Sequence, residues 1–168
     1  MLQGEEEPRP PTRWVSKDQW ASKDRVLSGA TEIVAGEIEV RTDLDVIEAT
    51  SRGRQLALWL GFCEIDVLSA ATTIAELGRN ILEYAHSGQI ILKAVHDGSR
   101  YGVVVTARDS GRGIPDVDIA VQEGYSTSGQ PGLGLAWVRR LMDECTIVST
   151  VGEGTEVTAK KWPSSDSR

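Results

Sequence analysis

The sequence predicts an α+β fold, a two-layer sandwich in which helices pack on one face of a mixed, mostly antiparallel sheet. Hydrophobic periodicity indicates the order strand, helix, helix, strand, strand, loop, helix, strand, strand, and this grouping of strands and helices is typical of the class. The chain has 168 residues, of which 40% are hydrophobic, so it is long and apolar enough for one domain with its own core.

The regular structure is expected to begin with a strand and a helix. Charged and apolar residues alternate over 37–41, which predicts an edge or surface strand with one wet face. A helix is expected over 43–60, with Asp43 as its candidate N-cap and Gly61 as its stop. Gly53 is expected to be a weak point inside this helix.

A second helix is expected over 64–86, followed by a hairpin. Apolar residues recur along this helix at intervals of three and four, namely Ile65, Leu68, Ala71 or Thr72, Ala75, Leu77, Ile81 and Tyr84. The β-branched runs 89–95 and 101–107 flank Asp97 and Gly98, a pair that marks a hairpin turn between antiparallel strands.

The last elements follow a loop that runs to about residue 130. A helix is expected over 133–143, and a closing pair of strands over 145–151 and 156–161. These elements complete the sandwich.

The two ends of the chain differ in composition from its centre. Residues 1–30 combine a glutamate run, several prolines and scattered Ser and Lys without periodicity, so they are expected to form a flexible N-terminal tail. The folded domain is expected over 31–162, and a polar C-terminal tail over 163–168.

Charge and hydropathy argue against several kinds of partner. The 18 basic and 25 acidic residues give a net charge of −7, which disfavours general binding to nucleic acid or to anionic membranes. The longest nearly apolar stretch, 56–63, is far shorter than the ~20 residues of a membrane span. The acidic N-terminus does not resemble a secretory signal, so a cytoplasmic protein is expected.

Three segments have residues suited to chemistry, and the first follows a strand. It runs over 109–115 as DSGRGIP. Gly111 and Gly113 permit positive φ and close approach of the backbone to a ligand, while the Asp109 carboxylate can accept a hydrogen bond from an amino group. Taken alone, such a segment is more often only a turn.

The second segment is rich in glycine and leads directly into a helix. It runs over 129–135 as GQPGLGL, and glycines at a helix N-terminus leave backbone N–H groups free to bind phosphate oxygens. It matches neither the P-loop nor the dinucleotide-binding fingerprint. Without other signals, a helix-entry loop explains it equally well.

The third segment lies inside the second expected helix. Glu76 and Asn80 are four residues apart, so they lie on the same face one turn apart. An Asn carbonyl is an oxygen ligand suited to Mg²⁺ bound to phosphates, and a carboxylate can take a proton from an attacking hydroxyl or water. A solvated helix face is the more frequent explanation of such a pair by itself.

Taken together and in this order, the segments resemble the four motifs of the GHKL, or Bergerat-fold, ATP-binding superfamily. They are 76–81 (ELGRNI), 109–115 (DSGRGIP), 124–128 (GYSTS) with 132–135 (GLGL), and 152–155 (GEGT). Within the superfamily the chain is most similar to the small serine kinases of sigma-factor partner switching, in the RsbT-type switch-kinase branch rather than the anti-sigma branch. The resemblance covers about residues 33–162.

The resemblance implies roles for the residues that match the first two motifs. Asn80 would hold Mg²⁺, and Glu76 would orient or deprotonate the acceptor hydroxyl. Asp109 would receive the adenine amino group, while Gly111 and Gly113 would let the base and ribose pack closely.

It implies that the later motifs bind the rest of ATP. Thr155 would assist adenine recognition, directly or through water. Glycines would bend the lid, the segment of the third motif at 124–135, so that its backbone N–H groups meet the phosphates and its hydroxyls assist. The backbone residues are Gly129, Gly132, Leu133, Gly134 and Leu135, and the hydroxyls are those of Ser126, Thr127 and Ser128.

The chain departs from the pattern of its relatives in its cations. No Lys or Arg occurs between Asp116 and Pro131, although relatives commonly place a basic lid residue on the terminal phosphate. Arg79, beside Asn80, could face phosphate or a protein partner, or be solvated. Slow phosphoryl transfer, activated in a complex, is therefore expected.

The resemblance implies an ATP-dependent protein serine/threonine kinase of a partner-switching, stressosome-like pathway, using ATP and Mg²⁺. Its substrate would be a STAS-domain protein, and after release from that scaffold it would activate a PP2C-type phosphatase. The alternative is an anti-sigma factor, a binding module whose kinase activity is directed at its own antagonist. Both alternatives use the same nucleotide pocket.

Overall fold

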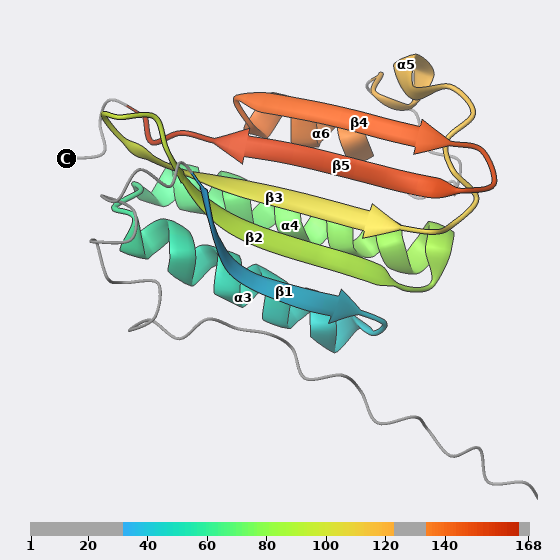
Figure 1. Cartoon of the computed structure of the whole chain (residues 1–168), viewed down its shortest axis with the longest axis horizontal. Helices are drawn as coiled ribbons and strands as arrows, with labels where there is room; N and C mark the ends of the chain where they lie inside the picture. Colours follow the sequence, from blue (N-terminus) through green and yellow to red (C-terminus); the bar gives the residue numbers. More distant parts are fainter. Residues whose placement is uncertain (1–31, 123–133, 165–168) are drawn as a thin grey trace, which may run out of the picture.

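A five-stranded sheet forms one layer of the molecule (Figure 1). The structure, a computed structural model, describes residues 32–122 and 134–164. The strand order is β1-β2-β3-β5-β4, and the strands are β1 (Glu32–Val40), β2 (Gly88–His96), β3 (Tyr101–Asp109), β4 (Glu144–Thr150) and β5 (Gly154–Lys161). The α+β class is confirmed, but every strand pair in the described residues is antiparallel, so the sheet is not mixed.

Three helices cover one face of this sheet, as expected for the sandwich. They are α3 (Asp43–Trp59), α4 (Glu64–Ala85) and α6 (Gly134–Leu141), and Figure 1 shows them behind the strands. The short helix α5 (Val117–Ala120) occupies a segment that we expected to be a loop. Asp116 explains it, because its side chain accepts a hydrogen bond from the Ile119 N–H at 3.0 Å and caps the single turn.

The N-cap of α3 differs from the expected one by a single residue. Thr42, not Asp43, is the N-cap, and its backbone N–H donates to Asp45 Oδ2 at 2.8 Å. The Thr42 side chain in turn accepts from the Asp45 N–H, which completes a capping box. Gly61 follows the helix with φ of +83°, so the expected stop is confirmed.

Gly53 is a contact point between helices rather than simply a weak point. A Cβ atom at this position would lie 2.0 Å from Cδ1 of the buried Ile74 on α4. Glycine therefore allows α3 and α4 to approach closely, which offsets its low helix propensity.

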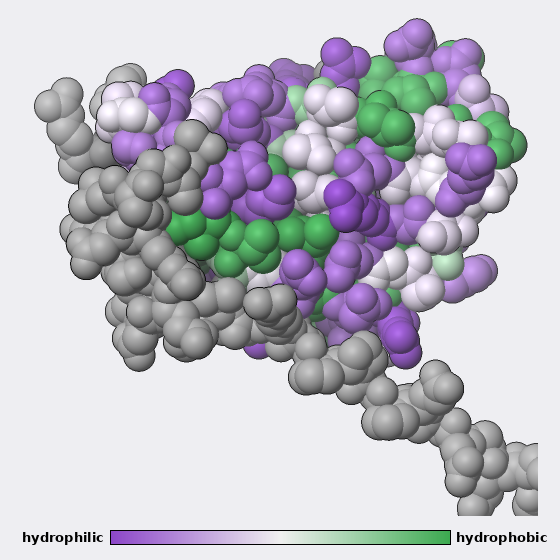
Figure 2. All heavy atoms as spheres, viewed as in Figure 1, coloured by the Kyte–Doolittle hydropathy of each residue, from purple (hydrophilic) through white to green (hydrophobic). Residues whose placement is uncertain are grey.

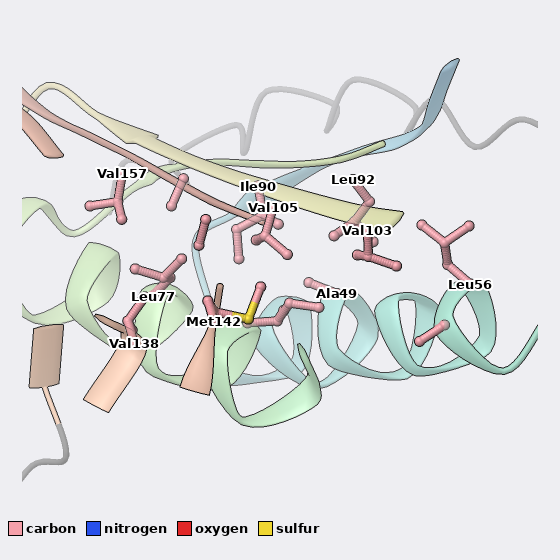
Figure 3. Packing of buried hydrophobic residues seen from close by; sticks show 14 of the residues in the cluster. Ala49, Leu56, Leu77, Ile90, Leu92, Val103, Val105, Val138, Met142 and Val157 are labelled. Atoms are coloured by element: carbon pink, nitrogen blue, oxygen red, sulfur yellow. The ribbon is translucent and has the colours of Figure 1, made fainter. Parts of the chain in front are cut away.

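The buried stripe of α4 is rotated from the expected one at the N-terminal end. Ile65 is 77% exposed and Leu68 is 60% exposed, so neither belongs to the core as we expected. The stripe is formed by Val67, Ala70, Ile74, Leu77 and Ile81. Figure 3 shows Leu77 among the apolar side chains between the helices and the sheet, with Val138, Met142 and Val157 nearby.

The opposite face of the sheet has no described helix over it. Figure 2 views this side of the molecule and shows hydrophilic residues around a band of hydrophobic ones. The hairpin of β2 and β3 forms as expected, with Gly98 in the turn at φ of +96°. None of the helices in the described ranges is long and apolar enough to cross a membrane.

Candidate nucleotide site

The centre of the candidate site is a buried carboxylate on α4. Glu76 is 4% exposed. Its Oε1 accepts a hydrogen bond from Arg79 Nη1 at 2.8 Å, and its Oε2 accepts one from the backbone N–H of Gly134 at 3.2 Å. Gly134 is the first residue of α6. The carboxylate therefore joins the middle of α4 to the N-terminus of the helix that follows the glycine-rich segment.

Asn80 lies one turn beyond Glu76 on the same helix. It is half-buried, and within residues 32–122 and 134–164 its side chain forms no hydrogen bond. The same ranges contain no cluster of three His, Cys, Asp or Glu residues that could hold a metal. A Mg²⁺ ion that keeps several waters and binds substrate phosphates needs few protein ligands, so the Asn80 amide oxygen fits such an ion.

The other end of the candidate site lies where three strands meet. Asp109 ends β3, and the register places it opposite Thr155 on β5 and opposite Gly88 on β2. The Asp109 Oδ1 accepts a hydrogen bond from the Gly111 N–H at 2.8 Å. Because side chains alternate along a strand, Asp109 shares the helix-facing side with Ala107 of the core.

A serine that we did not predict supports Thr155. The Ser149 hydroxyl on β4 lies 2.8 Å from the Thr155 hydroxyl and accepts from the Ile114 N–H at 2.8 Å. Ser149 donates its single hydrogen to the Gly154 carbonyl at 3.1 Å, so the Thr155 hydroxyl is the donor to Ser149 and keeps its lone pairs for another group. Counting outward from the turn at Gly152 places Ser149 opposite Thr155, a signal that the sequence contains.

Gly111 and Gly113 are required by packing within the protein. A Cβ at Gly111 would lie 2.6 Å from the Ala85 Cβ at the end of α4. Gly113 has φ of +73°, and a Cβ there would lie 2.3 Å from the Thr150 carbonyl oxygen. These two glycines therefore hold the 109–115 loop against α4 and β4, and their contact with the base and ribose stays a prediction.

The glycine-rich segment is described at its end. Gly134 has φ of +57°, and Leu135 is buried in the core. The predicted phosphate-binding and lid residues Ser126, Thr127, Ser128, Gly129, Gly132 and Leu133 lie outside the described residues.

A cavity of about 520 Å³ lies at the strand ends near Asp109 and Thr155. Gln89, Arg108 and Glu156 line it too, and their side chains alternate to the face of the sheet away from the helices. Glu76, Asn80 and Gly134 do not line it. We therefore place the candidate site on the helix side of Asp109 and Thr155, and this cavity is not its triphosphate end.

Residues that we expected to act together thus form two groups. Glu76 and Gly134 come together at the α4–α6 contact, and Asn80 lies one turn beyond Glu76 on α4. Asp109 and Thr155 come together across β3 and β5. The contact of Gly111 with Ala85 brings the loop after Asp109 against the C-terminal end of α4, the helix that carries Glu76 and Asn80.

Comparison with known proteins matches the sequence of this chain to a family model. The model of the histidine kinase-, DNA gyrase B-, and HSP90-like ATPases matches residues 65–165. The chain is 44% identical over 125 residues to the serine/threonine-protein kinase RsbT of Bacillus subtilis (strain 168), which covers 74% of this chain and 94% of that protein.

More distant relatives are anti-sigma F factors. The protein from Thermoanaerobacter sp. (strain X514) is 28% identical over 107 residues, which covers 60% of this chain and 73% of that protein. The protein from Geobacillus stearothermophilus is 41% identical over 64 residues, 36% of this chain and 44% of that protein.

Proposed function

Because the chain belongs to the histidine kinase-, DNA gyrase B-, and HSP90-like ATPase family and is a serine/threonine-protein kinase of the RsbT type, we propose that it phosphorylates a STAS-domain protein in a partner-switching pathway. The observation that carries the proposal is the hydrogen bond from Gly134 to Glu76. It brings a carboxylate to the helix N-terminus at which phosphate binding is predicted.

In the proposed reaction, Glu76 acts as the general base. The oxygen of the acceptor hydroxyl forms a bond to the γ-phosphorus of ATP, and its proton passes to the Glu76 carboxylate. The bond between the γ-phosphorus and the β–γ bridging oxygen breaks, and ADP leaves with that electron pair. The burial of Glu76 limits competing proton exchange with bulk water.

Asn80 would hold Mg²⁺, which supplies charge neutralisation for the phosphate oxygens when it is bound. Asp109 and Thr155 would select the base. The Asp109 carboxylate accepts from an amino group, while the free lone pairs of the Thr155 hydroxyl accept from the base or from a water.

The partners are proposed by resemblance to the RsbT-type kinases. A STAS-domain protein would be both substrate and scaffold, and a PP2C-type phosphatase would be activated after release. The rival function is that of an anti-sigma factor, which the similarity to anti-sigma F factors supports. Capture of purified STAS protein or purified sigma factor by the immobilised chain separates the two, since retention of the sigma factor alone would favour the rival.

Transfer of labelled phosphate from ATP to a STAS-domain protein tests the proposed function. Glu76→Gln is expected to lower the transfer rate by about a hundredfold or more, because loss of a general base has effects of this size. Folded Asn80→Asp protein is expected to lose phosphate transfer as well.

Glu83→Gln is the matched control, because Glu83 is an exposed acidic residue on the same helix. It is expected to transfer phosphate at the wild-type rate. Transfer by folded Glu76→Gln protein at that same rate would remove Glu76 from the proposed role.

A further inference from the structure

Arg79 and the backbone of Gly134 hold the same carboxylate from two sides. Arg79 Nη1 donates to one Glu76 oxygen at 2.8 Å, and the Gly134 N–H donates to the other at 3.2 Å. One donor is a guanidinium and the other is an N–H at a helix N-terminus. Both kinds of donor bind phosphate oxygens in proteins. In the structure, the Glu76 carboxylate accepts from both.

The surroundings of Arg79 allow its guanidinium to change partner. Its side chain is 59% exposed, whereas that of Glu76 is 6% exposed. The pair is thus an ion pair with one buried and one accessible member. If this ion pair breaks, the Glu76 carboxylate keeps the hydrogen bond from the Gly134 N–H and can accept another from a new donor. The accessible Arg79 guanidinium can then bind an anion that enters the site.

Neutralisation of a triphosphate in this chain requires a cation from outside the lid. Residues 116–133 contain Asp116, Asp118 and Glu123 and no Lys or Arg. The γ-phosphate carries most of the charge that phosphoryl transfer must stabilise. The side chains of this segment can offer hydroxyl donors to it but no positive charge.

Other arginines near the candidate site have different positions. Arg112 lies over the Tyr84 ring, with its guanidinium carbon 4.9 Å from the ring centroid. Arg139 and Arg140 lie in the last turn of α6, about 8 Å along the helix axis from Gly134. Arg79 already contacts the group that Gly134 contacts.

We propose that Arg79 binds the γ-phosphate of ATP in place of the absent basic lid residue, exchanging the Glu76 carboxylate for a phosphate oxygen. This inference rests on the proposed kinase function. The exchange has a second effect, because it releases Glu76 to accept the proton of the acceptor hydroxyl only when a γ-phosphate is present. ADP, which has no γ-phosphate, leaves the Arg79–Glu76 pair in place.

A simpler role for Arg79 is to neutralise Glu76. In that case, removal of Arg79 would weaken ATP binding because the uncompensated charge of Glu76 would repel the phosphates. The two roles differ once Glu76 is made neutral. If Arg79 contacts phosphate, Arg79→Ala still weakens ATP binding in the Glu76→Gln protein. If Arg79 only neutralises Glu76, Arg79→Ala has no such effect there, because the charge at position 76 is already gone.

The experiment measures the dissociation constants of ATP and ADP by calorimetry in four proteins: wild type, Arg79→Ala, Glu76→Gln and the double variant. The ATP-over-ADP preference is expected to fall about tenfold or more on Arg79→Ala, in both backgrounds, because a charged hydrogen bond to phosphate is lost. ADP affinity is expected to change by less than about twofold.

Arg79→Lys and Arg54→Ala complete the set. Arg79→Lys keeps the charge but not the forked geometry and is expected to retain part of the preference for ATP. Arg54 is an exposed arginine on α3, and Arg54→Ala is expected to bind both nucleotides as the wild type does. A purely structural role of Arg79 would change thermal stability without changing the ratio of the two affinities.

The outcomes separate this inference from the proposed function. If Arg79→Ala leaves the ATP-over-ADP preference unchanged, the proposed phosphate contact is overturned. It is also overturned if the preference is lost in Arg79→Ala but returns in the double variant with Glu76→Gln. Both results leave the kinase proposal intact if wild-type protein transfers phosphate to the STAS protein. Failure of the wild-type chain to bind ATP overturns the kinase proposal and this inference together.

Discussion

Two glycines near the β4–β5 turn both have positive φ but have different surroundings. Gly152 has φ of +82° and Gly154 has φ of +127°, both unfavourable for other residues. A Cβ at Gly152 would meet nothing within 4 Å, whereas one at Gly154 would lie 2.0 Å from the Asp109 carbonyl oxygen. Gly154 therefore permits the strand contact that places Thr155 beside Asp109.

Gly152→Ala and Gly154→Ala are a matched pair that tests this contact. Gly152→Ala is expected to lower the free energy of unfolding by about 1 kcal/mol through backbone strain alone. Gly154→Ala is expected to lower it by about 3 kcal/mol or more, because a steric overlap with backbone is added. Urea denaturation of both variants measures the difference, and equal losses would show that the approach to Asp109 is not tight.

The residues of the candidate site were largely predictable, but their partners were not. Glu76, Asn80, Asp109 and Thr155 could be proposed as site residues because their spacing and motif context are local properties of the sequence. The pairing of Glu76 with Gly134 joins positions 58 apart, and nothing in local periodicity connects them. Ser149 was missed because it becomes a candidate only when the register of β4 and β5 is counted outward from the turn at Gly152.

At the scale of elements, the N-terminal end of α4 is tied to the end of β5. Asp66 is buried and accepts hydrogen bonds from the backbone N–H and the hydroxyl of Ser164, both at 2.7 Å. Cys63 donates to the same carboxylate at 3.3 Å, and Lys161 lies 3.5 Å from it. Ser164, which we assigned to the C-terminal tail, is therefore attached to the helix layer.

These contacts set the direction of the Asp66 pKa. Burial alone would raise the pKa of Asp66, but the hydrogen bonds from Ser164 and Cys63 and the charge of Lys161 outweigh it, so the pKa lies below its ordinary value. The native state then binds fewer protons than the unfolded state as the pH falls past the ordinary carboxyl pKa of about 3.9. Acid therefore favours unfolding through this group.

Asp66→Asn is expected to lower the free energy of unfolding at pH 7 by about 1 to 3 kcal/mol, because hydrogen bonds to a charged acceptor are lost. The difference from wild type is expected to shrink as the pH falls below about 4. Ser164→Ala removes one of the two Ser164 donors, so it is expected to cost less. Denaturation curves from pH 3 to 7 check this, and a difference that grows in acid would contradict the sign.

The types of the elements could be predicted from periodicity, but the orientation of α4 could not. Apolar residues occur on two adjacent faces of this helix, and the interval of three or four fits both. Packing against the sheet selects the face with Val67 and Ile74 and leaves Ile65 and Leu68 exposed. Gly53 shows the same limit, since its role depends on Ile74, a partner in another helix.

At the scale of the whole molecule, the candidate site joins both layers of the sandwich. Glu76 and Asn80 belong to the helix layer, while Asp109 and Thr155 belong to the sheet. A ligand that contacts both layers binds the native state and not the unfolded chain, so it stabilises the fold as a unit.

ATP with Mg²⁺ is expected to raise the melting temperature more than ATP alone, because the ion adds binding free energy that the unfolded chain does not provide. Asn80→Ala is expected to remove most of this additional increase. Differential scanning fluorimetry with ATP, with Mg²⁺ and with both measures it. Equal shifts with and without Mg²⁺ in the wild type would take Asn80 out of the proposed metal site.

The position of β5 in the sheet was the part of the topology that the sequence did not reveal. Alternation predicts which side chains share a face, and the short turn at Gly152 predicts that β4 and β5 pair. Neither pattern indicates which of the two strands lies beside β3. The structure shows that it is β5, which places Thr155 next to Asp109.

Among the described strands, β5 comes after β3 and β4 in the chain and yet lies between them in the sheet. While a ribosome still holds residues 154–161, β3 has an open hydrogen-bonding edge and β4 has no neighbour in the described sheet. A nascent polypeptide at this stage cannot bring Thr155 beside Asp109, and neither can a translation product that stops before residue 154. If the proposed function is right, ATP can therefore bind at this site only after residues 154–161 have left the ribosome tunnel.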